Sequence, residues 1–158
     1  QILIRNPNLG KCQHVIARAH GYSSWQEMKK QSTPEDALNE VMAAHPELLV
    51  WGLATFRDKK NYAESGHDRL RLSVDEFRAS CEWLLLCKTI KTPNDRIGSS
   101  YGLKHRVEKW VGEYISNGAF IAAVFFLGIP YKEYWGSPNI SVAISSRCEH
   151  LKKSSPSH

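Results

Sequence analysis

The 158-residue chain lacks the long apolar runs and leader patterns of membrane and secreted proteins. Its longest apolar run, 119–127, is too short to span a bilayer. No secretory signal pattern opens the chain, because the polar residues RNP follow at positions 5–7. We therefore expect a cytoplasmic protein that does not enter a membrane. Because the first residue is Gln1 rather than Met, we also expect that residues upstream of it are missing.

Cysteine is scarce and has no metal-binding or redox spacing. The four cysteines, at positions 12, 81, 87 and 148, form no Cys-x-x-Cys pair and no cluster with histidine at zinc spacing. Cys81 and Cys87 lie six residues apart on one expected helix, so their side chains point about 120° apart and cannot easily bridge. Free thiols in a reducing compartment are favoured over disulfides, and no metal site is expected.

Three common catalytic and nucleotide-binding motifs are also absent. The chain contains no G-x-S-x-G nucleophile turn, no G-x-G-x-x-G and no P-loop. Nothing therefore predicts a serine hydrolase, a dinucleotide-binding domain or a P-loop NTPase, and we expect no cofactor.

The composition is that of a soluble globular domain, with 42% hydrophobic and 23% charged residues. The net charge of +5 is unevenly distributed. Residues 1–30 carry five Lys or Arg and one acidic residue, and residues 88–109 carry six Lys or Arg and two acidic residues. Residues 31–50, in contrast, carry four acidic residues and no Lys or Arg. Either the acidic block neutralises the basic ones, or a basic surface remains that could bind phosphate.

The first 32 residues predict a helical hairpin. Leu9, Cys12, Val15, Ile16 and Ala19 form a helical stripe, Gly21 ends it, and a second short helix carries Trp25. The stretch KCQHVIARAHGYSSWQEMKK resembles the AHGYxSWxxL hairpin of many bacterial proteins, including N-terminal appendages of glyoxalase-superfamily proteins. The resemblance covers about twenty residues and implies a small helical module of bacterial origin, without a catalytic assignment. No glyoxalase core follows, because its repeated strand pattern is absent.

The remaining chain predicts a mainly helical domain, 33–147, and a polar tail, 148–158. Thr33 caps a helix that begins with Pro34 and ends near Ala44. In the apolar stretch 48–56 the spacing of hydrophobic residues does not distinguish a helix from a strand, and we favour a helix. The charged stretch 58–71 reads as a mobile loop. Ser73 and Glu76 form a capping box at the start of a broad-faced helix that extends to about 90.

Residues 96–128 have the outline of a helix-turn-helix followed by a β-hairpin. Ser99 or Ser100 caps a helix whose Leu103, Val107, Trp110 and Val111 should face the core. The second helix, 116–128, is apolar almost all round, so it cannot read base edges and is either a core helix or a dimer interface. An interface would use Phe120, Val124 and Phe125. Segments 131–135 and 140–145, joined by the turn GSPN, predict the C-terminal hairpin.

The helix 100–111 carries the main candidate site. Tyr101, Lys104, His105 and Glu108 share one stripe, which is either an acid–base or phosphate-contact group or a solvated polar face. The turn Gly98-Ser99-Ser100 either binds an anion at the helix start or simply caps it. The candidate residues for contacts with nucleic acid or an anion are Arg96, Ser99, Ser100, Tyr101, Lys104, His105, Arg106 and Lys109.

The stretch SSYGLKHRVEKWVGEYISNGAFIAA also resembles segments of uncharacterised accessory proteins of bacterial plasmids and integrative elements. Our leading hypothesis is a non-enzymatic, nucleic-acid-associated accessory protein of such a mobile element, with phosphate contacts to DNA or RNA from the basic helix. The first alternative is an interaction module, inhibitor-like or antitoxin-like, that uses the apolar helix. The second is a small enzyme, which requires Tyr101, Lys104, His105 and Glu108 to line a concave pocket.

Overall fold

The computed structural model describes residues 33–148, so the expected hairpin 1–32 and all but the first residue of the expected tail lie outside the described residues. The described part is mainly α-helical with a short β-hairpin near its end, as expected. Its elements, in order, are α3 (Pro34–Ala44), β1 (Leu48–Leu49), β2 (Gly52–Leu53), α4 (Lys60–Arg71), α5 (Val74–Leu86), the 3₁₀ turn η1 (Asp95–Ile97), α6 (Ser100–Val111), α7 (Asn117–Phe126), β3 (Tyr131–Glu133) and β4 (Ile140–Val142).

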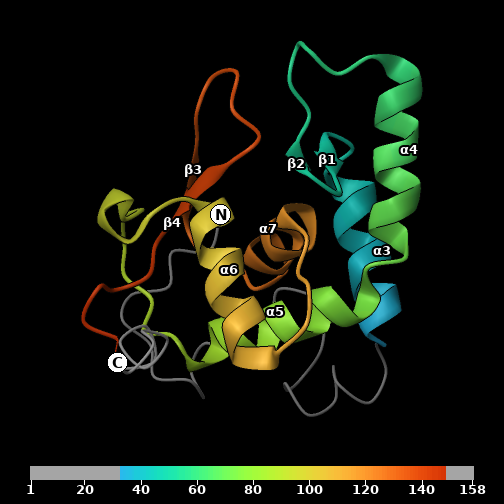
Figure 1. Ribbon diagram of the computed structural model, residues 1–158. Helices are drawn as coiled ribbons and strands as arrows, with labels where there is room; N and C mark the ends of the chain where they lie inside the picture. The colour runs from blue at the N-terminus through green and yellow to red at the C-terminus, as the bar shows by residue number, and fades with distance from the viewer. Residues whose placement is uncertain (1–32, 149–158) are drawn as a thin grey trace.

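Helix α7 forms the centre of the molecule, with α3, α5 and α6 packed around it (Figure 1). It is buried on almost every side because its sequence offers no polar face. Trp83 of α5 packs edge-on against Phe120 of α7, and neither side chain is exposed. Phe120 and Val124 therefore belong to the chain's own core, which was the first of the two alternatives for this helix, and an interface through these two side chains is wrong; Phe125 is partly buried.

Helix α3 begins as predicted, because the Thr33 hydroxyl accepts a hydrogen bond from the N–H of Asp36. The predicted cap of α5 is wrong in its contacts. The Ser73 hydroxyl donates to the carbonyl of Arg69, and the Glu76 carboxylate accepts from the distant N–H of Ser116. The two groups that a capping box would pair locally instead tie α5 to α4 and to the start of α7.

The segment 48–56 is not the helix we favoured. Leu48 pairs with Leu53 and Leu49 with Gly52, which makes a tight antiparallel turn. Gly52 has φ +130°, and a Cβ there would lie 2.3 Å from the carbonyl oxygen of Pro138. The apolar run is too short to fill a helix face, and only glycine permits this turn to form so close to its neighbour.

The segment 58–71 is not the mobile loop we expected, because most of it forms α4. The helix was hidden from pattern analysis because its buried side consists only of Gly66 and Leu70. At Gly66 the missing side chain allows the Trp51 ring to approach, since a Cβ would lie 2.8 Å from it. The backbone of α4 therefore packs directly against the β1–β2 turn, so α4 does not need the apolar stripe by which a packed helix is usually recognised.

The C-terminal hairpin is present, with Tyr131 opposite Val142 and Glu133 opposite Ile140. Every residue from Ile140 to Ile144 is buried, so this side of the hairpin has no exposed face. The one polar side chain of β4, Ser141, donates to the Asp95 carboxylate, as does Tyr134. These bonds hold the pKa of Asp95 below its ordinary value.

Cys81, Cys87 and Cys148 are free thiols. Burial raises the pKa of Cys81 and of Cys87 far above the ordinary value. No helix among residues 33–148 is long and apolar enough to cross a membrane.

Candidate functional site

The candidate site is a pocket of about 300 Å³ between α6, the start of α7 and the β1–β2 turn. Its lining residues are Val50, Trp51, Tyr101, Lys104, His105, Glu108, Tyr114 and Asn117. The pocket thus contains all four residues of the predicted α6 stripe. The enzyme hypothesis required this concave arrangement, and the structure meets that requirement.

The backbone around the pocket is held by contacts between distant segments. Gly112, with φ +80°, ends α6 and lets the chain turn towards α7. The N–H of Gly118 donates to the carbonyl of Val50 at 2.8 Å. A Cβ on Gly118 would lie 1.9 Å from the carbonyl oxygen of Leu49. The start of α7 therefore presses directly on the β1–β2 turn, which brings Trp51 to the pocket.

Lys104 is not on a solvated face, because only 4% of the residue is exposed. Its Nζ donates to Glu108 Oε1 at 2.8 Å, four residues further along the helix. The same nitrogen lies 5.3 Å from the ring centroid of Tyr101 and 4.7 Å from that of Tyr114. The ammonium group is thus paired with one carboxylate and held between two aromatic rings, an environment that stabilises a cation out of water.

Glu108 connects the cation, the histidine and the backbone. Besides Lys104, it accepts hydrogen bonds from His105 Nδ1 at 2.6 Å and from the N–H of Ile115 at 3.2 Å. Partial burial raises the pKa of Glu108, but these three donors more than offset burial, so the pKa lies below its ordinary value. The carboxylate is therefore ionised at neutral pH and held in one orientation.

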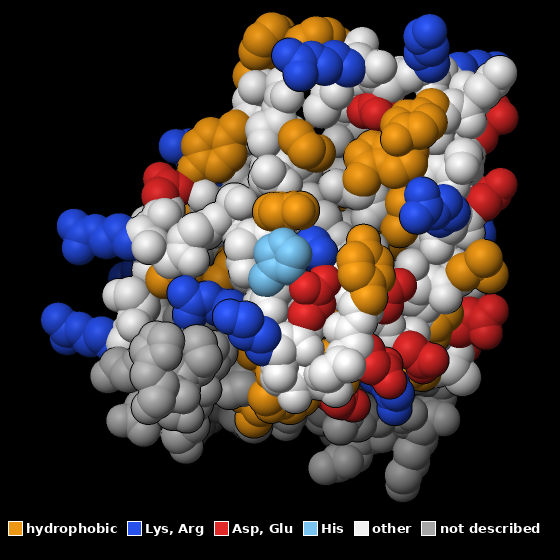
Figure 2. All heavy atoms as spheres, in the orientation of Figure 1, with side chains coloured by type: hydrophobic (Ala, Val, Ile, Leu, Met, Phe, Trp, Pro, Cys, Tyr) orange, Lys and Arg blue, Asp and Glu red, His pale blue; other side chains and the backbone are white. Residues whose placement is uncertain are grey.

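His105 stands at the exposed edge of this network. Its Nδ1 is bonded to the Glu108 carboxylate, and its ring meets Tyr101 edge-on with a centroid distance of 4.8 Å. A carboxylate acceptor requires the proton to be on Nδ1, which leaves Nε2 of the neutral ring as an acceptor. Figure 2 shows histidine, acidic and hydrophobic side chains gathered on the face over α6, with Lys and Arg side chains beside them.

Asn117 contributes an unusual buried group. Its amide nitrogen donates to the carbonyl of Trp51 and to the side chain of Asn139, both at 2.9 Å. Its Oδ1 is buried and has no hydrogen-bond partner within the described part of the chain. A buried acceptor without a donor is costly, so this amide destabilises the fold locally, beside the wall of the pocket that it helps to form.

The other predicted site residues do not join the pocket. Ser100 is buried, and its hydroxyl accepts from the N–H of Ile140 at 3.1 Å. Ser99 occupies the cap position of α6 without a side-chain hydrogen bond. Arg96 lies on η1 and is exposed, as is Lys109 of α6. Arg106 lies close enough to Cys87 for its charge to lower the thiol pKa, against the stronger effect of burial.

Two of the residues predicted to face the core are exposed at the end of α6. Trp110 is 43% exposed and Val111 37%, because the buried side of the helix follows Ser100, Leu103, Lys104 and Val107. Lys104, which the pattern assigned to the polar stripe, lies on this buried side. Sequence analysis also missed Trp51, Tyr114 and Asn117 as pocket residues, since no local pattern links segments that are up to 66 positions apart.

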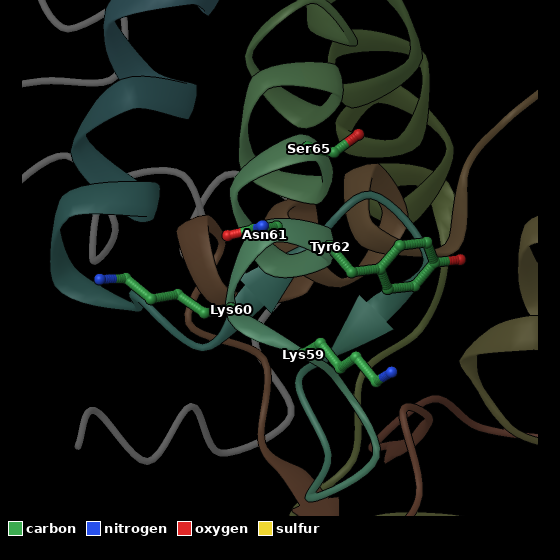
Figure 3. A pocket seen from close by; sticks show the side chains of 5 residues that line it. All are labelled: Lys59, Lys60, Asn61, Tyr62 and Ser65. Carbon is green, nitrogen blue, oxygen red and sulfur yellow. The ribbon is translucent and has the colours of Figure 1, made fainter.

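A second hollow, of about 540 Å³, lies at the start of α4 and is lined by Lys59, Lys60, Asn61, Tyr62 and Ser65. Figure 3 shows Lys59 and Tyr62 extending to one side of the helix and Lys60 to the other. The Tyr62 ring stacks on Trp51 with a centroid distance of 4.2 Å. Trp51 therefore connects this hollow with the α6 pocket.

Within residues 33–148, no three His, Cys, Asp or Glu side chains are grouped as metal ligands. Comparisons with protein-family models, with curated proteins and with solved structures find no match. The functional argument therefore depends on the geometry of the pocket.

Proposed function

We propose that the α6 pocket binds a small polar molecule and that His105 exchanges a proton with it. The observation that carries this proposal is the His105–Glu108 hydrogen bond at the edge of a pocket that also contains the buried Lys104. A histidine oriented by a carboxylate beside a cavity is the usual arrangement of a general base or acid. This proposal develops the enzyme alternative of the sequence analysis.

His105 would act through Nε2. The bond from Nδ1 to Glu108 fixes the ring and the tautomer, so Nε2 presents a lone pair to a bound molecule. The Glu108 carboxylate therefore orients the base towards the bound molecule.

Lys104 and Asn117 would orient the bound molecule. An ammonium group has three donors, and Lys104 uses one of them on Glu108. Its charge would stabilise negative charge that develops on the ligand when His105 removes a proton. Asn117 would act indirectly, since its amide nitrogen holds the Trp51 carbonyl and the Asn139 side chain in place at the wall of the pocket.

The lining residues define the class of ligand. Trp51, Tyr101 and Tyr114 supply aromatic walls, and about 300 Å³ is at the lower end of the volumes of small-molecule sites. We therefore expect a compact, planar molecule that carries a hydrogen-bond donor and an acidic or carbonyl group.

The test is a fragment screen by NMR with the full chain, using planar carboxylic acids and amides as probes. We expect hits that shift the resonances of His105, Tyr101 and Trp51, and that weaken at least tenfold in Lys104→Met. In the free protein, His105 should carry its neutral-form proton on Nδ1. His67→Gln is the control, because His67 bonds to the carbonyl of Pro46 away from the pocket. Hits that never map to the pocket, or a proton on Nε2, would refute the proposal.

Nucleic-acid association, as an accessory protein of a mobile element, is our second proposal. What supports it is the net charge of +5 and the exposure of Arg96 and Lys109. Burial of Lys104 against Glu108 removes one of the predicted phosphate contacts. The test is a gel-shift series with duplex and single-stranded DNA, in which binding must weaken as salt rises. Absence of binding at low salt would refute this second proposal.

A further inference from the structure

Two loops meet at one end of the molecule and display an exposed aromatic pair. The chain between β2 and α4 carries Phe56, and the chain between β3 and β4 carries Trp135. The two rings stack with a centroid distance of 5.4 Å and an interplanar angle of 24°. Figure 1 shows both connections projecting from the helical body on the same side. We call Phe56 and Trp135 the aromatic tip.

The aromatic tip contributes little to the hydrophobic core. Trp135 is 93% exposed and Phe56 68%, so each ring keeps most of its surface in water. Leaving two large aromatic rings exposed forgoes several kcal/mol of possible burial, on the order of 2 kcal/mol for each ring. Gly136, with φ +71°, places its Cα beside the Phe56 ring, where a Cβ would lie 3.3 Å away. The turn thus supports the ring pair without covering it.

Cations are found on and next to the segments that carry the aromatic tip. The Arg57 guanidinium lies 5.4 Å from the Phe56 ring centroid, and Lys59 and Lys60 follow it in an exposed stretch. Lys132 lies 5.1 Å from the ring of Tyr134, the neighbour of Trp135. In Figure 2, hydrophobic and Lys or Arg side chains lie side by side at the top of the molecule.

Two carboxylates also lie on or next to these loops, and they differ in whether other groups of the chain already bind them. Asp58 accepts hydrogen bonds from the N–H and the hydroxyl of Thr55, which hold it within its own loop. Glu133 is exposed on β3. Asp95, which accepts a hydrogen bond from Tyr134, offsets the charge of Lys132, and Lys60 points to the opposite side of α4 from Lys59 (Figure 3). Within the two connections themselves, residues 54–59 and 134–139, Arg57 and Lys59 outnumber the single carboxylate Asp58, so the surroundings of the aromatic tip favour an anionic partner over a cationic one.

We infer that the aromatic tip is a stacking surface for the bases of single-stranded nucleic acid, with Arg57 and Lys59 contacting the phosphates. Exposed aromatic rings bordered by cations are the features that bind unpaired strands, because every base has a flat face and every linkage a charge. A duplex hides the faces of its bases, so it would use only the cations. The inference rests on the second proposed function and is independent of the α6 pocket.

The test measures binding of the full chain to a fluorescein-labelled 20-residue oligo(dT) by fluorescence anisotropy at low salt. Phe56→Ala and Trp135→Ala should each weaken binding about tenfold to a hundredfold, the usual loss for one stacked base. Arg57→Ala should weaken binding and make its dependence on salt shallower. Trp110→Ala is the matched control, since it removes a partly exposed tryptophan from α6, an element that does not carry the tip. All variants are exposed positions and should keep the unfolding midpoint of the parent chain.

Three other outcomes would overturn the inference, and they separate it from the function on which it rests. If the chain binds no oligonucleotide, both fail. If it binds and is weakened only by Arg96→Ala and Lys109→Ala, nucleic-acid association stands and the aromatic tip is not its site. If duplex DNA competes as well as the single strand, the contact is electrostatic only and stacking is refuted.

Discussion

The ion pair between Lys104 and Glu108 allows a quantitative prediction, because only 5% and 20% of the two side chains are exposed. Glu108→Gln keeps the shape of the side chain and leaves the lysine charge buried without a counter-ion. Removing one partner of a buried pair costs about 3–5 kcal/mol, and we expect about 3 kcal/mol because the pocket admits water to Nζ. Lys104→Met should cost less, about 1–2 kcal/mol, because Glu108 keeps its bonds to His105 and Ile115.

The double variant Lys104→Met/Glu108→Gln distinguishes a buried pair from two independent side chains. Without either charge, the introduced glutamine can still accept a hydrogen bond from the N–H of Ile115, so the double variant should cost only about 1–2 kcal/mol. The sum of the single costs is then larger than the cost of the double variant by about 2 kcal/mol or more, which is the coupling energy.

The assay is urea unfolding at neutral pH, followed by circular dichroism, with the slope required to be equal among variants. Asp68→Asn is the control, because the Arg71–Asp68 pair is 56% and 75% exposed and should be worth less than about 1 kcal/mol. If Glu108→Gln costs under about 1 kcal/mol, or if the two single effects add within about 0.5 kcal/mol, Lys104 is not a desolvated partner of Glu108. The account of the pocket would then be wrong.

Four further predictions test the packing and the electrostatics. Gly118→Ala should destabilise the fold by about 3 kcal/mol or prevent folding, because the new Cβ would overlap the Leu49 carbonyl. Gly102→Ala, whose Cβ would meet nothing within 4 Å, should instead stabilise α6 by up to about 1 kcal/mol. Equal unfolding midpoints for the two variants would contradict this. Phe120→Ala should lower the free energy of unfolding, measured in urea, by about 3–5 kcal/mol and leave the molecular mass in light scattering unchanged. A change of oligomeric state at unchanged stability would restore the interface hypothesis. Folding lowers the pKa of Glu108, so the stability that its carboxylate contributes is complete above the ordinary pKa of 4.5 and is lost as the pH falls through the lower pKa of the folded state. The difference in unfolding free energy between the parent chain and Glu108→Gln should therefore shrink in urea series below pH 4.5. A difference that stays constant would be evidence against this electrostatic contribution. Burial raises the pKa of the partly exposed Cys81, so peptide mapping should show it alkylated by iodoacetamide much more slowly in the folded chain than after unfolding. Equal rates of alkylation in the two states would contradict this.

Local sequence patterns predict the elements whose ends depend on nearby residues. Thr33 and Pro34 start α3, and Gly112 ends α6, because caps and turns are decided within a few positions of the chain. The apolar composition of 117–126 likewise identifies a buried helix. The same analysis places Tyr101, Lys104, His105 and Glu108 on one side of α6, since helical spacing alone sets that relation.

Local hydrophobic patterns fail to predict an element where it packs through a glycine against a distant segment instead of through an apolar side chain. Helix α4 has almost no apolar stripe because Gly66 packs directly against Trp51. The β1–β2 turn depends on Gly52 lying against the carbonyl of Pro138, which belongs to the distant β3–β4 connection. Neither contact changes the local period of hydrophobicity, so the sequence alone indicated a loop and a helix in their place.

The sequence by itself determined which groups α6 presents together, because a helix fixes the spacing of its own side chains. Only the tertiary structure decided that this face is a pocket rather than a solvated surface. Tyr114, Asn117 and Trp51 come from segments that meet because α7 has no side chain at Gly118 and can press on the β1–β2 turn. Burial by those segments converts Lys104 from an ordinary surface charge into a desolvated partner of Glu108, and it leaves His105 oriented at the opening.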